Sequence, residues 1–427
     1  MILNAPVIIT LVIFFLTYGL IISEAINRTI LALVGASLIL VASVISQEQA
    51  IKTIDFNTIG LLIGMMIIVG ITRRTGVFEY MAIKAAKLAK GDPLLIMVAL
   101  SGVTVITSSL LDNVTTVLLV VPVTFSICNE LEIDSVPFLI SQILASNIGG
   151  TATLIGDPPN IMIGSAAGLS FIDFLTNLFV PIFSVFIGTM LVLRVVYRKQ
   201  LRASELSRSR IMRLHEFEAI KDYGLLKKSL IVLALTILGF LLHKVIHLEP
   251  ATIALGGAAL LMLITKEEPE DILLVIEWPT LFFFAGLFII VGALDHVGVI
   301  EYVARKSIEA TSGAMVSSTM LILWLSALAS AFIDNIPFVA TMIPLIQKMG
   351  QIGGIENLKP FWWALSLGAC LGGNGTLIGA SANVIVAGLA EKNGVLLTYK
   401  GFLKIAFPLM ILSIIISSVY IFAAYLI

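Results

Sequence analysis

The feature that most constrains this chain is a series of apolar runs that are long enough to cross a lipid bilayer, which takes roughly 20 residues of helix. Of the 427 residues 59% are hydrophobic and only 12% are charged, whereas about a quarter of a soluble protein is charged. The sequence therefore predicts an all-α integral membrane protein of the plasma membrane, with the lipid bilayer as its main solvent. Clear runs lie at Ala5–Ile22, Thr29–Ser46, Thr58–Thr72, Lys228–His247 and Thr280–Leu294.

The remaining composition excludes several classes of function. The net charge of −1 offers no basic surface to nucleic acid, and no GxxxxGK[ST] loop is present to hold ATP. Cys128 and Cys370 lie in apolar runs without CxxC or Cys/His spacing, so neither a disulfide framework nor a metal site is expected. Residues 1–4 contain no Lys or Arg, unlike a cleavable signal, so the first run is expected to remain as a span. No enzymatic activity and no cofactor is expected.

The chain repeats itself. At an offset of 222 residues, Thr58–Lys84 matches Thr280–Lys306 at twelve of 27 positions, and Asp112-Asn113 falls on Asp334-Asn335. At an offset of 223, the glycine-rich segment 149–156 falls on 372–379. Chance matches among Ile, Val and Leu do not explain a constant register of Gly, Asp-Asn and Glu-Tyr. We expect a first repeat over 1–198, a basic linker over 199–227 and a second repeat over 228–427.

The number of spans sets the orientation of the repeats. Each repeat is expected to cross five times and to contain one re-entrant hairpin, and an odd number of crossings inverts the second repeat relative to the first, as in secondary transporters. About ten crossings follow, with hairpins near 93–128 and 314–348. The expected crossings are 5–22, 29–46, 57–72, 135–165 and 174–196, then 228–247, 251–265, 280–294, 361–390 and 401–427.

The distribution of basic residues predicts the topology. With the linker in the cytoplasm, 20 of the 26 Lys and Arg residues lie on the cytoplasmic side, which satisfies the positive-inside rule. Both termini are then extracytoplasmic. Phe78–Lys90 and Ile300–Glu309 are expected to form short amphipathic helices along the interface.

Three aspartates, Asp112, Asp157 and Asp334, lie inside apolar segments, with no Lys or Arg inside a span to pair with them. A buried Asp costs about 2.5–3.5 kcal/mol on insertion scales, so each needs compensation or a function. One interpretation is that each caps a helix, because Pro158 and Pro337 follow closely. The functional interpretation remains open beside it, since a helix that begins at mid-membrane requires a protein-lined or watery cavity.

Glycine-rich breaks interrupt one crossing in each repeat. Glycine allows a helix to unwind and to expose backbone groups to an ion, although close helix packing is the alternative explanation. Two breaks and two hairpin tips are expected to meet near the midplane around one cavity. The candidate binding residues are Asp112, Asn113, Thr115, Gly149, Gly150, Thr151, Asp157, Asn160, Asp334, Asn335, Gly372, Gly373, Asn374, Thr376 and Asn383.

The segments Leu111–Thr116, Asn147–Asn160, Asp334–Pro337 and Gly372–Asn383 resemble the ion transporter superfamily. They look most like its arsenite permease and melanosomal P-protein branch, with NhaD-type sodium/proton antiporters and citrate and dicarboxylate carriers more distant. The resemblance implies a scaffold, a moving transport domain, elevator-type alternating access and a homodimer. It also allows a soluble ATPase partner on the basic linker. The dicarboxylate branch carries Ser-Asn-Thr at the hairpin tips, where this chain has Asp-Asn.

The leading hypothesis is a proton-coupled secondary transporter that exports a small inorganic solute of the arsenite or antimonite type. Asp112 and Asp334 are expected to carry the coupling ion, H+ or Na+. A sodium/proton antiporter and an organic or inorganic anion permease are the alternatives within transport. A channel and an aspartyl protease are the alternatives from other classes, and the protease lacks the Tyr-Asp and Gly-x-Gly-Asp contexts of intramembrane enzymes.

Overall fold

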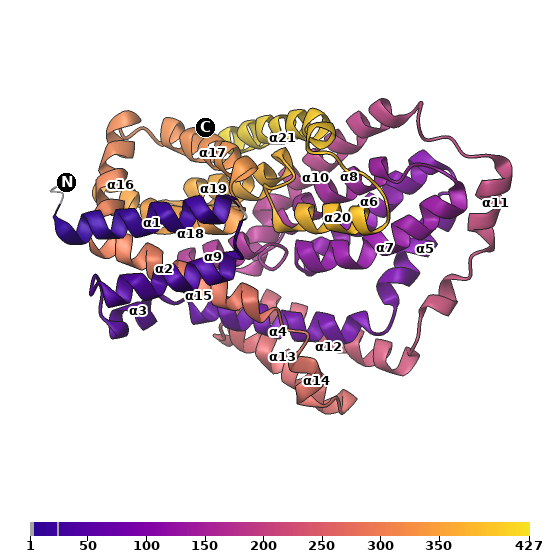
Figure 1. Cartoon of the computed structure of the whole chain (residues 1–427), viewed down its shortest axis with the longest axis horizontal. Helices are drawn as coiled ribbons and strands as arrows, with labels where there is room; N and C mark the ends of the chain where they lie inside the picture. The colour runs from indigo at the N-terminus through magenta and orange to yellow at the C-terminus, as the bar shows by residue number, and fades with distance from the viewer. Residues whose placement is uncertain (1–3, 24) are drawn as a thin grey trace.

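The computed structural model describes residues 4–23 and 25–427, which form helices and no strands (Figure 1). The first half contains α1 (Ala5–Ser23), α2 (Arg28–Val41), α3 (Gln47–Thr53), α4 (Phe56–Arg73), α5 (Val77–Leu88), α6 (Pro93–Leu110), α7 (Asn113–Leu131), α8 (Val136–Thr151), α9 (Pro158–Ala167) and α10 (Phe171–Tyr197). The connection contains α11 (Glu205–Arg213) and the short helix η1 (Glu216–Ala219). The second half contains α12 (Tyr223–Ile246), α13 (Pro250–Thr265), α14 (Pro269–Leu273), α15 (Trp278–His296), α16 (Val299–Ala310), α17 (Met315–Phe332), α18 (Asn335–Gly353), α19 (Lys359–Gly372), η2 (Gly373–Gly375), α20 (Ser381–Lys392), α21 (Tyr399–Ile421) and η3 (Phe422–Leu426).

The helices confirm the all-α membrane architecture. Within the described residues nine helices are long and apolar enough to cross a membrane, and three of these are limbs of the hairpins. The shorter apolar helices α2 and α13 and the two broken helices α8–α9 and α19–α20 account for the other expected crossings. The predicted interfacial segments correspond to α5 and α16. Helix α12 begins at Tyr223, so the end of the predicted linker is helical; the repeat boundaries themselves stay a prediction.

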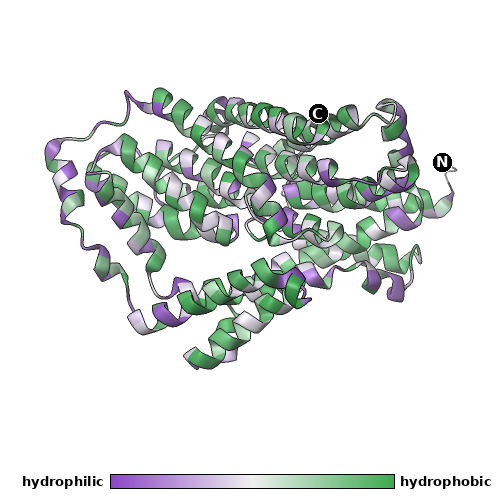
Figure 2. Cartoon of the chain, turned by 180° about the vertical axis from the view of Figure 1, so that it is seen from behind, coloured by the Kyte–Doolittle hydropathy of each residue, from purple (hydrophilic) through white to green (hydrophobic). Residues whose placement is uncertain are grey.

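Large apolar side chains cover the outer faces of the long helices. Phe15 is 66% exposed on α1, and Leu191 is 58% exposed on α10. Figure 2 shows hydrophobic residues along these shafts, whereas hydrophilic residues gather in the connection that contains α11. Such continuous apolar surface is stable only against lipid or another apolar partner.

Each hairpin ends halfway along a broken helix. A Cβ on Gly156, in the α8–α9 break, would lie 2.6 Å from the carbonyl oxygen of Ser108 near the tip of α6. In the second half Gly379 has the same relation to Ser330, at 2.9 Å. The α6–α7 and α17–α18 hairpins extend from opposite ends of the molecule and their tips approach its centre (Figure 1). This is the arrangement of inverted repeats with re-entrant hairpins.

The scaffold, which we define as α1, α2, α4, α12, α13 and α15, joins the two halves. Thr29 on α2 donates its hydroxyl hydrogen to the carbonyl of Pro279 on α15 at 2.8 Å. In the equivalent pair, the backbone N–H of Ala251 on α13 donates to Asn57 Oδ1 on α4 at 3.1 Å. Gly64 makes close packing possible, because a Cβ there would lie 2.7 Å from the Cβ of Ala254. Each half therefore supplies one helix to each pair.

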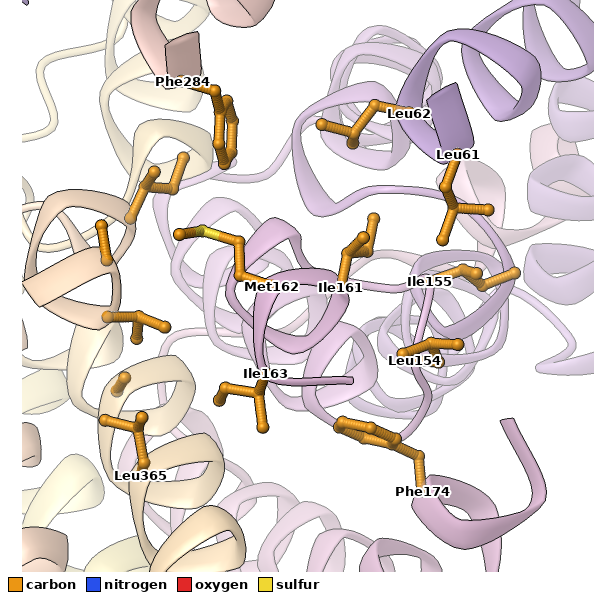
Figure 3. Close-up of a cluster of buried hydrophobic side chains, with 14 of the residues drawn as sticks. Leu61, Leu62, Leu154, Ile155, Ile161, Met162, Ile163, Phe174, Phe284 and Leu365 are labelled. Atoms are coloured by element: carbon orange, nitrogen blue, oxygen red, sulfur yellow. The ribbon is translucent and has the colours of Figure 1, made fainter. Parts of the chain in front are cut away.

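The hairpin body, which we define as α6–α9 with α17–α20, packs on this scaffold through apolar side chains. Figure 3 shows Ile161 and Met162 of α9 between Leu61 and Leu62 of α4 on one side and Phe284 of α15 on the other. All five side chains are buried in one core cluster. The contact of α9 with α4 is therefore mainly apolar, with one hydrogen bond from Asn57 Nδ2 of α4 to Ser165 Oγ of α9 at 3.4 Å.

Candidate functional site

The hairpin tips are built by aspartate caps. Asp112 precedes α7 and accepts hydrogen bonds from the backbone N–H of Thr115 at 2.8 Å and from its hydroxyl. Asp334 precedes α18 and accepts from the N–H of Ile336 at 3.0 Å. The capping prediction is thus confirmed for these two residues. Asp157 occupies the cap position of α9 but makes no side-chain cap bond there.

A ladder of asparagine side chains connects the tip of the first hairpin to the second break. Asn113 donates from Nδ2 to Asn147 Oδ1 at 3.2 Å. Asn147 donates in turn to Asn374 Oδ1 at 2.9 Å and to Asn383 Oδ1 at 3.0 Å. All four side chains are buried. The ladder joins the two halves within the hairpin body and keeps its polar groups paired in an apolar environment.

Two equivalent asparagines close the breaks. Asn160 donates from Nδ2 to the carbonyls of Thr151 at 3.1 Å and Thr153 at 3.0 Å. Asn383 donates to the carbonyls of Gly373 at 2.8 Å and Thr376 at 2.9 Å. The backbone carbonyls freed by unwinding are therefore satisfied by the protein itself.

The glycines of the breaks serve close packing. A Cβ on Gly149 would overlap the Val105 carbonyl of α6, and one on Gly372 would lie 2.5 Å from the Ala327 carbonyl of α17. Gly150 and Gly373 each lie against the far end of the same break, near the carbonyls of residues 156 and 379. None of these four has a positive φ. The packing explanation that the sequence left open therefore describes them directly.

A small cavity lies where the first hairpin tip, the first break and the scaffold meet. Its volume is about 30 Å³, which is room for one or two water molecules. Asn335 Nδ2 donates to Asp157 Oδ2 at 3.1 Å across it, which connects the second hairpin tip to the first break. Three carboxylates and one guanidinium border the cavity, so acidic groups outnumber basic ones in its lining. The polar lining residues are Arg28, Asp112, Asn113, Asp157, Glu277, Thr280, Asn335 and Ser381.

The expectation that the intramembrane aspartates lack a basic partner is wrong for Asp334. Arg28 Nη1 lies 2.7 Å from Asp334 Oδ2 and 2.7 Å from Ser381 Oγ. Arg28 stands at the start of α2, so the sequence places it in a loop at a span end. The tip of the second hairpin lies beside that loop, which brings Asp334 to Arg28. Asp334 borders a second cavity of about 300 Å³, which is mainly apolar.

The predicted residues fall into three groups. Asp112, Asn113, Asp157 and Asn335 line the small cavity. Thr115 supports Asp112, and Asp334 is paired with Arg28. The others lie behind the cavity in the closed breaks: Gly149, Gly150, Thr151, Asn160, Gly372, Gly373, Asn374, Thr376 and Asn383.

Sequence reasoning missed five contributors. Arg28, Glu277 and Ser381 border the cavity, Asn147 centres the ladder, and Ser366 donates to Asn160 Oδ1 at 2.7 Å. Asn147 and Ser366 were detectable as polar residues inside crossings. Within the part of the chain that the structure describes, no three His, Cys, Asp or Glu side chains gather as a metal site.

Similar proteins agree with this architecture. The citrate transporter family matches residues 18–368. A Mycobacterium tuberculosis protein named as an uncharacterized transporter is 44% identical, over 98% of each chain. The human P protein is 35% identical over 96% of this chain, which spans 59% of that protein. The solved YdaH transporter of Alcanivorax borkumensis has the same fold, with a TM-score of 0.59 over 98% of each chain at 13% identity. The chain is a multi-pass membrane transporter and belongs to the citrate transporter family.

Proposed function

We propose that this chain is a proton-coupled secondary active transporter of a small inorganic solute, of the arsenite or antimonite type, in the plasma membrane. The observation that carries the proposal is the small acidic cavity at the junction of the first hairpin tip and the first break. Its volume of about 30 Å³ suits an ion or a solute of a few atoms. Asp112 and Asp157 face it from the hairpin body, so protons bound there travel with the solute.

The carboxylates provide the coupling chemistry. In this low-dielectric site Asp112, Asp157 and Glu277 share one nearby cation, Arg28, and three adjacent ionised carboxylates repel one another. Binding a proton relieves this repulsion. Because the pair Asp112 and Asp157 belongs to the hairpin body, each proton loads the moving part rather than the scaffold.

Elevator movement is the proposed transport step. The apolar contact of Ile161 and Met162 with Leu61, Leu62 and Phe284 permits the hairpin body to slide along the scaffold (Figure 3). An apolar side chain that leaves one apolar neighbour during this movement can pack against another. The asparagine ladder supports the same proposal, since it makes the two hairpins and breaks a single unit.

An anion permease is the second candidate. Arg28 lines the cavity and offers a guanidinium to a carboxylate, and the matching family is named for citrate transport. Citrate is too large for the cavity in this conformation, so this candidate requires the hairpin tips to separate from the scaffold. Sodium/proton exchange at the same carboxylates is the remaining alternative.

The test is uptake by proteoliposomes under an imposed pH gradient, with arsenite, sodium and citrate measured in parallel. Arsenite flux that depends on the gradient and is lost in Asp112→Asn and Asp157→Asn supports the proposal. Asn keeps the cap of α7 but cannot carry a proton. Asp134→Asn is the matched control, since Asp134 is exposed on the loop before α8 and should leave flux unchanged. Gradient-driven citrate or sodium flux without arsenite flux would reject the inorganic solute.

The basic linker is less available to a soluble partner than its composition indicates. Arg210 pairs with Glu132 at 2.9 Å, Arg208 with Asp92 at 3.3 Å, and Lys87 of α5 with Glu216 at 2.5 Å. The linker thus binds the base of the first hairpin. We propose that an ATPase partner, where one binds, uses the remaining basic residues of the linker.

A further inference from the structure

The cluster formed by Arg28, Asp334 and Ser381 has a geometry that the proposed transport cycle does not yet use. One guanidinium nitrogen contacts both the carboxylate and the hydroxyl, each at 2.7 Å, and the hydroxyl also donates to Asp334 Oδ2 at 2.9 Å. The guanidinium carbon lies 5.0 Å from the centre of the Phe283 ring. The side chains of Arg28 and Asp334 are 31% and 14% exposed, so water screens the pair only partly.

The cluster joins the two parts that must separate. Arg28 and Phe283 belong to the scaffold, at the start of α2 and on α15. Asp334 and Ser381 belong to the hairpin body, at the second hairpin tip and the start of α20. Any movement of the body along the scaffold therefore breaks this ion pair.

The internal repeat shows that the cluster has no counterpart. At the offset of 222 residues Asp334 corresponds to Asp112, but Arg28 corresponds to Pro250. At the offset of 223 residues Ser381 corresponds to Pro158. Both donors are therefore replaced by proline side chains, which have no hydrogen to donate. Inverted repeats exchange roles between the two end states of a transport cycle, so the opposite end state has no ion pair of this kind.

We propose that Arg28 is a built-in counter-ion that displaces the coupling proton or cation from Asp334 at one end of the cycle and holds the hairpin body there. This inference rests on the proposed alternating access and deepens it by adding Asp334, beside Asp112 and Asp157, as a residue at which a coupling ion is released. When Asp334 arrives protonated, Arg28 replaces the proton, which leaves through the adjoining cavity of about 300 Å³. When Asp334 binds a proton again, the ion pair is lost, only hydrogen bonds from the guanidinium to neutral groups remain, and the body can leave. The positive-inside prediction places this end in the cytoplasm.

Other charged groups near the pair must be separated from its effect. Glu277, Asp112 and Asp157 border the small cavity that Arg28 also lines, and each can bind a proton. Their protonation changes the charge around Arg28 without removing it. Glu277→Gln is therefore a required control in every pH experiment on the pair.

The experiment measures the position of the hairpin body by thiol labelling. Val384 is 41% exposed and lines the cavity beside Asp334, whereas both native cysteines are buried, so Val384→Cys supplies one reactive thiol. The maleimide labelling rate of this variant is followed between pH 8 and pH 5 and is divided at each pH by the rate of Glu48→Cys, an exposed site outside the cluster, because the reactive thiolate fraction of every cysteine itself falls about tenfold per pH unit below its pKa. A single obligatory proton changes the ratio of two states by up to about tenfold per pH unit. With Arg28 present, we expect the normalised labelling rate to change by nearly tenfold per pH unit. In Arg28→Gln it should change by less than about twofold per pH unit.

Arg28→Lys and Glu277→Gln should keep most of the slope, since both leave a cation facing Asp334. A steep slope in Arg28→Gln, or a flat slope with Arg28 present, would overturn the inference. Labelling needs no solute, so it is independent of the proposed cargo. Absence of arsenite, sodium and citrate flux together with an Arg28-dependent slope rejects the proposed function alone.

Discussion

Asparagine 383 provides the sharpest test of how the broken helices are held. Its side chain is fully buried and takes part in three hydrogen bonds, which join it to the carbonyls of Gly373 and Thr376 and to the Nδ2 of Asn147. Hydrogen bonds between membrane helices contribute about 0.6 kcal/mol on average and up to about 1.7 kcal/mol. Loss of three bonds in Asn383→Ala should therefore lower the free energy of unfolding by about 2–5 kcal/mol.

Asn383→Asp should be more destabilising than Asn383→Ala at neutral pH. The aspartate keeps the acceptor for Asn147 but places a carboxylate oxygen against two carbonyl oxygens, where the amide donated. The matched control is Asn393→Ala on the exposed end of α20, where the side chain makes one bond to the carbonyl of Leu389. This control should change stability by less than about 0.5 kcal/mol.

The assay is equilibrium unfolding of the purified protein by sodium dodecyl sulfate in mixed micelles, followed by circular dichroism. Asn160→Ala should behave like Asn383→Ala, because Asn160 makes the equivalent bonds in the first break. Equal unfolding free energies for Asn383→Ala and Asn393→Ala would refute the reasoning. Such a result would mean that the unwound carbonyls find other partners at no cost.

Three further perturbations test other features. Gly372→Val should prevent stable folding, because its Cβ would lie 2.5 Å from a backbone oxygen. Gly102→Ala on α6 should raise the unfolding free energy by up to about 1 kcal/mol, because a Cβ there has nothing within 4 Å. Thermal melts in detergent compare the two variants. Glu48→Cys should be labelled by an impermeant maleimide on intact cells and Leu206→Cys only after permeabilisation, because both sites are exposed and lie at opposite ends of the molecule; the reverse pattern would invert the topology. The hydrogen bond from Lys87 holds the pKa of Glu216 below its usual range, so the contact between Lys87 and Glu216 should be present at neutral pH and be lost as the pH falls through the lowered pKa. Protease cleavage of the linker in inside-out vesicles should increase as the contact is lost. Glu216→Gln should abolish this pH dependence.

The sequence was most informative where polar residues and glycines interrupt apolar runs. Asp112, Asp334 and both glycine-rich segments stand out against the surrounding residues and recur at a fixed offset, so the hairpins, the breaks and the inversion could be predicted together. Arg28 could not be recognised, because a basic residue at a span end is ordinary and its partner lies 306 residues away. Its contact with Asp334 depends on where the tip of the second hairpin lies against the scaffold, which no local pattern records.

The glycines show a different limit. Sequence alone cannot distinguish a glycine that unwinds a helix from one that admits a neighbouring backbone, because both lack a Cβ and both occur near breaks. Gly149 and Gly372 prove to be contact positions for the hairpin limbs. Likewise the carbonyls of Gly373 and Thr376 appear free in a break until the position of Asn383 is known.

The exchange of scaffold helices between the halves has a consequence for synthesis. Helix α4 packs against α13 at Gly64 and Ala254, and α2 packs against α15 at Thr29 and Pro279. A ribosome that has completed α4 still has almost 200 residues to translate before α13 emerges, which takes about 10–40 s at usual elongation rates. During that interval the first half waits in the bilayer with the small-residue faces of α2 and α4 uncovered. Its nascent chain is thus committed to the membrane long before it can fold, and helices α13 and α15 of the second half complete the scaffold pairs that α4 and α2 begin.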